Sequence, residues 1–225
     1  HGKFRRQRQM CIRDSFLIFN KPSNFAVHSG TKNDHGLIDV LRTIIKNNSL
    51  NLCHRLDKGT SGCLVIAKNQ KFLGFFNDQL KKRKVKKIYH AIVKDYISEE
   101  MHINDLIDIN TKGSLNKVSI NKEGKEAKSI FKPLKRYSGS SLIEIQILTG
   151  RTHQIRAQCE KINKNIANDN KYGCSYFNKH LKNSGIKRLG LHSYEISFLD
   201  LKDKRNTFFA DYDDEFENIL SYLKT

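Results

Sequence analysis

The sequence contains few acidic residues, no paired cysteines and no long apolar run. Only 23 aspartates and glutamates stand against 41 lysines and arginines, which gives a formal net charge of +18 over 225 residues. The five cysteines are scattered without a Cys-x-x-Cys pair, which argues against a disulfide framework and a zinc finger, and free thiols fit a reducing cytoplasm. No apolar run approaches the roughly 20 residues of a membrane-spanning helix, so we expect no membrane segment.

The sequence also lacks the residues for two other kinds of site, a dinucleotide- or phosphate-binding loop and a metal centre. The sequence has no glycine-rich loop of the kind that binds dinucleotides or phosphates. A metal-dependent nuclease could use His54, Asp57 and His153, but such a site needs several carboxylates around a divalent ion, and none stands at a usable spacing. We therefore expect no bound metal.

The excess of positive charge favours encounter with a polyanion, and nucleic acid is the commonest one. The alternative is a basic protein whose charge only keeps it in solution. The charge is densest in KKRKVKK, residues 81–87. Lys82, Arg83 and Lys84 in this run are expected to contact RNA phosphates, although a solvated helix end is the competing interpretation.

Short strand and helix patterns are interspersed along the chain. Apolar runs or alternation predict strands at 16–19, 63–67, 89–97, 143–147 and 189–199. Helical spacing of apolar residues predicts helices at 37–45, 72–80, 155–162 and 216–223. Residues 98–128 are polar and predict a hairpin with loops. We expect one α+β domain over residues 15–225, with a mainly antiparallel mixed sheet flanked by helices. An irregular basic leader at 1–14 precedes it, which is an RNA-binding arm, a linker remnant or non-native.

The segment NLCHRLDKGTSG, residues 51–62, places polar and basic residues between a predicted helix and an apolar strand. Asp57 stands beside Arg55 and Lys58, and nearby positive charge favours an ionised carboxylate. An ionised aspartate can act as a nucleophile or as a general base. Alternatively, Asp57 only caps a turn through Gly59 and Thr60, which is a routine position for aspartate.

Two further segments combine reactive side chains with regular structure. GRTHQIR, residues 150–156, leads from a strand end into a helix, where Arg151 and Arg156 suit an anion such as a phosphate or the carboxylate of Asp57. The alternative is a capped helix with exposed arginines. In KIYHAIV, Tyr89 shares a strand face with Ala91, and it either stacks on a base or is a core aromatic.

These three segments, in this order, resemble the HRLDxxTSG, KxYxAxV and GRTHQ[IL]R motifs of RluA-type pseudouridine synthases. FLIFNKPSNFAVHSG, IANDNKYG and RLGLHSYEISF are similar to other segments of that family, with Asn24 and Asn168 at positions where glycine is usual. The resemblance covers about residues 16–223. It is nearest to the RluC branch, which modifies large-subunit ribosomal RNA, and we expect the catalytic domain without the S4-like domain that usually precedes it there.

The resemblance implies a pseudouridine synthase catalytic fold and an isomerase that detaches uracil from C1′ of the ribose, rotates it and rejoins it through C5, without a cofactor or metal. Asp57 would be the catalytic residue, Tyr89 would pack against the flipped uracil, and Arg151 would pair with Asp57. We expect RNA contacts from polar residues in and beside the motifs: His54, Arg55, Lys82, Arg83, Lys84, His153, Gln154 and Arg156.

The expected substrate is 23S ribosomal RNA, modified in the cytoplasm by a monomer. Two alternatives stay open. One is a tRNA-directed enzyme of the same family, and the other is a non-catalytic RNA-binding module on the same fold.

Overall fold

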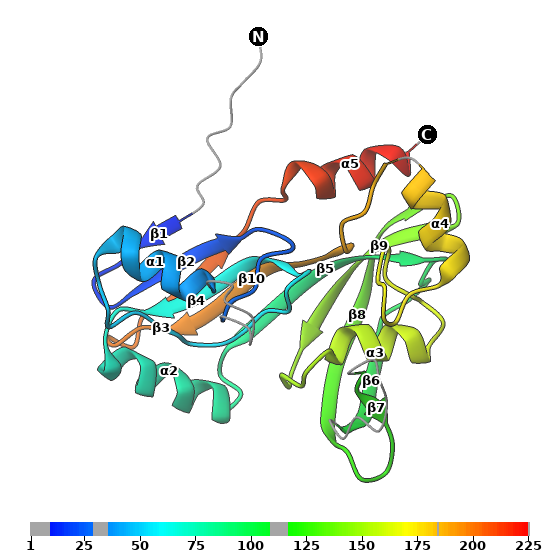
Figure 1. Cartoon of the computed structure of the whole chain (residues 1–225). Helices are drawn as coiled ribbons and strands as arrows, with labels where there is room; N and C mark the ends of the chain where they lie inside the picture. The colour runs from blue at the N-terminus through cyan, green and yellow to red at the C-terminus, as the bar shows by residue number, and fades with distance from the viewer. Residues whose placement is uncertain (1–9, 29–35, 109–116, 184, 225) are drawn as a thin grey trace. The chain divides into compact units, whose positions relative to one another are not determined.

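The computed structural model describes residues 10–28, 36–108, 117–183 and 185–224. Its contacts divide the chain into two compact units. The first unit holds the chain up to residue 85 together with residues 193–211, and the second holds residues 86–192 together with the C-terminal residues from 212. Figure 1 shows the elements of both units.

The sheet of the first unit is built on two apolar strands. β2 (Phe16–Lys21) pairs antiparallel with β4 (Ser61–Ala67), which is buried along its whole length. The short strands β1 (Met10–Ile12) and β3 (Asn51–Leu52) pair antiparallel with β2 and β4. β10 (Leu191–Leu199) lies next to β4 and pairs antiparallel with β11 (Arg205–Phe209).

An aromatic cluster holds helix α2 (Gln70–Lys81) on one face of this sheet. The ring of Phe16 stacks on Phe72 with centroids 4.8 Å apart, and Phe76 and Phe198 join the same cluster. α2 begins at Asn69, whose side chain accepts a hydrogen bond from the backbone N–H of Phe72. Helix α1 (Leu37–Ile45) also belongs to this unit.

The second unit contains a four-stranded antiparallel ladder extended by a short edge strand. β5 (Lys86–Lys94) pairs with β9 (Ser140–Ile147), and β9 pairs with β8 (Lys125–Tyr137). β6 (Met101–Asp108) pairs with β8 and with β7 (Ser119–Ile120).

Three helices complete the second unit. In α3 (Gln154–Lys161), Ala157 belongs to the same apolar cluster as Ala127 of β8. α4 (Ser175–Asn183) and α5 (Asp214–Tyr222) share an apolar cluster with Ile92 of β5 and Leu142 of β9.

The mixed α/β fold class is confirmed, because the strand pairings described above are antiparallel and five helices accompany the strands within the described residues. The structure differs from the sequence predictions in three places. Within the leader expected to be irregular, Met10–Ile12 form β1. The hairpin expected over residues 98–128 is present, because β6 pairs antiparallel with β8, but β8 continues to Tyr137, and neither this continuation nor α4 had been predicted.

Candidate active site

Asp57 lies in the first unit, on the loop between β3 and β4. Its backbone carbonyl accepts a hydrogen bond from the N–H of Thr60 at 3.1 Å, which closes a turn. Leu56 and Thr60 on either side are buried, whereas Asp57 is only partly buried. The turn and its two buried flanks therefore fix the backbone at Asp57, and the residue itself stays partly exposed.

A buried lysine ties this turn to the end of β2. Lys21 is fully buried, and its ammonium donates to the carbonyl oxygens of Pro22 and Phe25 at 2.8 Å and of Lys58 at 3.1 Å. An ammonium has three N–H donors, and these three carbonyls provide an acceptor for each. Lys58 directly follows Asp57, so Lys21 holds the backbone next to the candidate catalytic carboxylate. The sequence prediction had missed this role.

The start of β4 approaches β10 so closely that only glycine fits at position 62. A Cβ on Gly62 would lie 2.2 Å from the backbone oxygen of Ser193, and the φ angle of Gly62 is +106°. Both the space and this left-handed backbone exclude a side chain. The glycine that ends HRLDKGTSG is therefore required by the packing of the loop.

His54 connects the loop that carries Asp57 to β4 and to α2. Its Nε2 accepts a hydrogen bond from the N–H of Val65 at 3.1 Å, and its ring stacks on Phe76 with centroids 6.2 Å apart. Cys53 donates its N–H to the carbonyl of the same Val65 at 3.0 Å. These contacts favour a positioning role for His54 over the expected RNA contact, whereas its neighbour Arg55 is exposed.

The expected phosphate-binding run follows α2. Lys82, Arg83 and Lys84 are all exposed. The N–H of Arg83 bonds to the carbonyl of Leu80 and that of Lys84 to the carbonyl of Gln79, which is a Schellman motif with Arg83 at φ +55°. The three cationic side chains therefore stand on a backbone turn with a defined conformation.

Tyr89 lies in the second unit, on β5. It is 7% exposed and stands opposite Ile145 of β9, on the same face of β5 as the buried Ala91. Tyr89 is thus largely enclosed, as a core aromatic would be, on the strand next to the one that leads to Arg151.

The loop that carries Arg151 follows β9 and lies along β8. The backbone N–H of Arg151 donates to Oε1 of Gln154 at 3.0 Å, and its Nε donates to the carbonyl oxygen of Glu126 at 2.9 Å. Arg151 is partly buried. Its side chain therefore leaves the loop in a direction set by β8.

Gln154 uses its whole amide to hold this loop. Its Oε1 accepts from Thr149 and Arg151, and its Nε2 donates to the Lys128 carbonyl and to Ser129, all at 2.8 to 3.0 Å. The side chain is 3% exposed. An amide has two donors and one acceptor oxygen, so these bonds favour a positioning role for Gln154 in place of the expected RNA contact.

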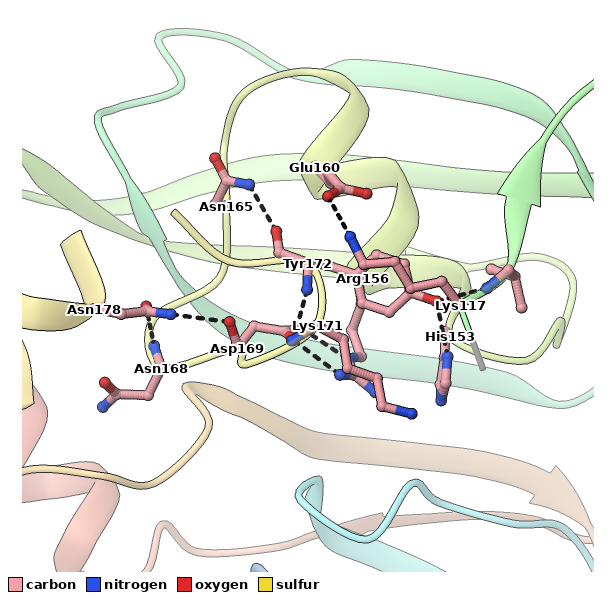
Figure 2. A network of polar contacts seen from close by, with 11 residues as sticks. Lys117, His153, Arg156, Glu160, Asn165, Asn168, Asp169, Lys171, Tyr172 and Asn178 are labelled. Atoms are coloured by element: carbon pink, nitrogen blue, oxygen red, sulfur yellow. Dashed lines mark hydrogen bonds and ion pairs between the residues drawn. The ribbon is translucent and has the colours of Figure 1, made fainter. Parts of the chain in front are cut away.

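Arg156 and His153 belong to a polar network around Tyr172, drawn in Figure 2. Arg156 forms a two-pronged ion pair with the buried Asp169 at 2.7 and 2.8 Å. The hydroxyl of Tyr172 accepts from the N–H of Val118 at 2.8 Å and is hydrogen-bonded to Nδ1 of His153 at 2.9 Å. Arg156 is therefore engaged inside the protein, and Tyr172 links the start of α3 to the segment before β7.

The electrostatics of this network follow from its partners. Burial raises the pKa of Asp169, but hydrogen bonds and charge from Arg156 outweigh that effect, so the pKa of its carboxyl lies below the ordinary value. Burial raises the pKa of Tyr172, which keeps its hydroxyl protonated. The network is thus a fixed ion pair beside a neutral phenol.

The predicted site residues fall into two groups. Asp57, His54 and Arg55 share one loop of the first unit, whereas Tyr89 and Arg151 belong to the second unit. The expected pairing of Arg151 with Asp57 stays a prediction. Among the described residues, no group of three histidine, cysteine or acidic side chains is arranged to hold a metal ion. None of the described helices is long and apolar enough to cross a membrane.

Residues 15–161 match the family model described as RNA pseudouridylate synthase. The chain is 38% identical over 213 residues to ribosomal large subunit pseudouridine synthase C of Buchnera aphidicola subsp. Baizongia pistaciae, covering 92% of this chain and 68% of that protein. It is 35% identical over 217 residues to the protein of the same name from Haemophilus ducreyi, covering 94% of this chain and 67% of that protein.

A solved structure has the same fold. The structure titled human RNA pseudouridylate synthase domain containing 1 superposes with a TM-score of 0.77, covering 100% of this chain and 97% of that one, at 22% identity.

Proposed function

Because the chain belongs to the RNA pseudouridylate synthase family, we propose that it isomerises uridine to pseudouridine in large-subunit ribosomal RNA. Family membership rests on the match over residues 15–161 and on relatives that are 38% and 35% identical to the chain over the aligned residues. The names of those relatives support ribosomal RNA as the substrate. The net charge of +18 suits a polyanion of this kind.

The observation that carries the chemistry is the Asp57 turn, where a partly exposed carboxylate stands on a backbone fixed by Thr60 and by the buried Lys21. In the reaction the bond from C1′ to N1 of uracil breaks and a bond from C1′ to C5 forms. C5 loses its proton and N1 gains one, so substrate and product contain the same atoms. Asp57 acts either as the nucleophile at C1′ or as the base that deprotonates the ribose.

Tyr89 and Arg151 are proposed to complete the site. Since C1′ and C5 are inaccessible in a stacked nucleotide, the uridine has to leave its stack before it reacts. Tyr89 would pack against the released uracil. Arg151 would keep Asp57 ionised through its positive charge. The contacts of Arg151 with Gln154 and Glu126 support this role because they leave its guanidinium on a fixed loop.

The structure refines which predicted residues are suited to contact RNA. The side chains of Arg55, Lys82, Arg83 and Lys84 are exposed and are proposed to bind phosphates. His153 is partly exposed at the start of α3 and is proposed to contact RNA there. The buried bonds of His54, Gln154 and Arg156 support positioning roles instead: His54 holds the Asp57 loop, and the other two hold the Arg151 loop and α3.

The enzyme is further proposed to act as a monomer in the cytoplasm. The two alternatives are a tRNA-directed synthase and a non-catalytic RNA-binding module. They differ from the main proposal in substrate and in turnover, so one assay separates all three.

The test is tritium release from transcripts labelled at C5 of uridine, because the reaction removes the proton from that carbon. The purified chain is incubated separately with large-subunit ribosomal RNA, small-subunit ribosomal RNA and a mixture of tRNAs. Release from large-subunit RNA alone is expected. Release from tRNA alone would replace the proposed substrate, and binding without release from any transcript would contradict the enzymatic function.

A further inference from the structure

Lys87 stands on β5 two residues before Tyr89, so both side chains lie on the same face of the strand. Its ammonium reaches the loop that carries Arg151. A Cβ built on Gly150 would lie 3.3 Å from Nζ of Lys87. The ammonium of Lys87 therefore lies beside Gly150, the residue that directly precedes Arg151.

Within the described part of the chain, no opposite charge acts on the pKa of Lys87. Among the residues that the structure describes, no carboxylate or carbonyl accepts a hydrogen bond from its ammonium. Burial lowers the pKa of Lys87 to about 8, and burial is the whole cause of this shift. At neutral pH the group is nevertheless mostly protonated. Lys87 thus carries a positive charge that is partly withdrawn from water.

Three other cationic side chains that are withdrawn from water have partners within the protein. The ammonium of Lys21 donates to three carbonyl oxygens, Arg156 pairs with Asp169, and the buried Arg188 pairs with Asp213 at 2.9 Å. A partly buried charge without such a partner costs free energy unless an opposite charge reaches it. Since Lys87 is still partly exposed, an anion from outside the protein can approach it.

We propose that Lys87 and Arg151 together form a binding site for one phosphate of the RNA backbone beside the target uridine. This inference rests on the proposed function, because that function supplies the RNA. A phosphate fits better than a uracil carbonyl, since a neutral oxygen would not compensate the charge of a desolvated ammonium. A lysine acts towards phosphate as a point charge, whereas the neighbouring arginine can bind it through two N–H groups.

The test compares Lys87→Met with Lys94→Met, a control that removes a lysine from the other end of β5, where the ammonium pairs with Asp95 at 2.7 Å. RNA binding is measured by fluorescence anisotropy over a series of salt concentrations. Loss of one phosphate contact is expected to reduce the slope of log K against log salt by about one in Lys87→Met. Lys94→Met is expected to keep the wild-type slope. A wild-type slope in Lys87→Met would overturn the proposal.

A second readout separates binding from a structural role. Because Lys87 has no partner among the described residues, Lys87→Met is expected to unfold in urea at the same or a higher midpoint than the wild type. A clearly lower midpoint would show that the lysine stabilises the fold and would overturn the proposal. In the tritium-release assay, KM is expected to rise about tenfold with a smaller change in kcat.

The two proposals fail in distinguishable ways. If the wild-type chain releases no tritium from any RNA, the proposed function is wrong, whatever Lys87→Met does. If the wild type is active and Lys87→Met keeps both its KM and its salt slope, only the role assigned to Lys87 is wrong.

Discussion

In the first unit a buried ammonium holds the Asp57 turn through backbone carbonyls, whereas in the second unit the neutral amide of Gln154 holds the Arg151 loop. The first arrangement concentrates the support in Lys21 and in the close approach at Gly62. The second spreads it over Gln154 and the network around Tyr172. A loop supported at few points should be more sensitive to one substitution than a loop supported at many.

Gly62→Ala should have the largest effect. The new Cβ would lie 2.2 Å from the Ser193 carbonyl oxygen, in a backbone conformation that disfavours any side chain. We expect the free energy of unfolding to fall by about 4 kcal/mol or more. Urea denaturation measures this loss. Gly74→Ala in α2 is the matched control, because a Cβ at position 74 meets nothing within 4 Å, and it should stabilise the protein by about 0.5–1 kcal/mol. Equal effects of the two substitutions would refute the close-packing account.

Lys21→Met should have the second largest effect on the free energy of unfolding. It removes a buried ammonium and leaves three backbone carbonyl oxygens without the donor that they share, and we expect a loss of about 3–5 kcal/mol in the free energy of unfolding. Lys71→Met removes an exposed lysine from α2 and should change the unfolding midpoint little. If both variants unfold at the wild-type midpoint, the buried ammonium does not support the Asp57 turn.

Part of the loss of folding stability at acidic pH should come from His90 in the second unit. Burial lowers the pKa of His90 to about 4, and its Nδ1 is hydrogen-bonded to the hydroxyl of Tyr212 at 2.5 Å. The unfolded chain binds a proton at this histidine near pH 6.5, and the folded chain does so only near pH 4. The stability that His90 contributes is therefore complete above pH 6.5 and is lost as the pH falls towards 4, by up to about 3 kcal/mol.

Urea denaturation at several pH values across that range measures this contribution. The fall in stability should be smaller in His90→Gln, which does not titrate there. A variant that loses stability with pH as steeply as the wild type would assign the acid sensitivity to other groups.

Of these substitutions, Tyr172→Phe should have the smallest effect on the free energy of unfolding. It removes the hydroxyl that accepts from the N–H of Val118 and is hydrogen-bonded to His153, while the ring can stay in its apolar cluster with Val118 and Ala157, so we expect a loss of about 1–2 kcal/mol. Tyr176→Phe is the control, because Tyr176 is 80% exposed. A loss in Tyr172→Phe as large as that of Lys21→Met would remove the proposed difference between the two loops.

Much of the fold could be predicted from apolar patterning. The fully buried β4 appears as a continuous apolar run, and α2 appears as phenylalanines at helical spacing. β8 was missed because it contains Pro133 and many lysines, which its solvent-facing positions and a register shift next to Pro133 accommodate. α4 was missed because few of its residues are apolar, and it is held by tertiary packing of Phe177 and Leu181.

The sequence motifs were enough to predict the main residues of the candidate site, but not the contacts that their neighbouring side chains make. Asp57, Tyr89 and Arg151 could be identified from the sequence because they stand in three motifs that follow one another in the same order as in RluA-type pseudouridine synthases. The inward bonds of His54, Gln154 and Arg156 could not be foreseen, since a polar side chain beside a reactive loop can turn either to solvent or to the backbone. Lys21 was missed because a lysine is ordinarily expected at the surface.

The central claim is that the carboxylate of Asp57 performs the chemistry. The most direct measurement is tritium release from C5-labelled ribosomal RNA by Asp57→Asn, with the exposed Asp78→Asn as the matched control and RNA affinity measured in parallel. We expect Asp57→Asn to lose at least about a thousandfold in turnover while its affinity for RNA stays within about twofold, because only the reacting group has changed. Turnover by Asp57→Asn at the rate of Asp78→Asn would contradict the account.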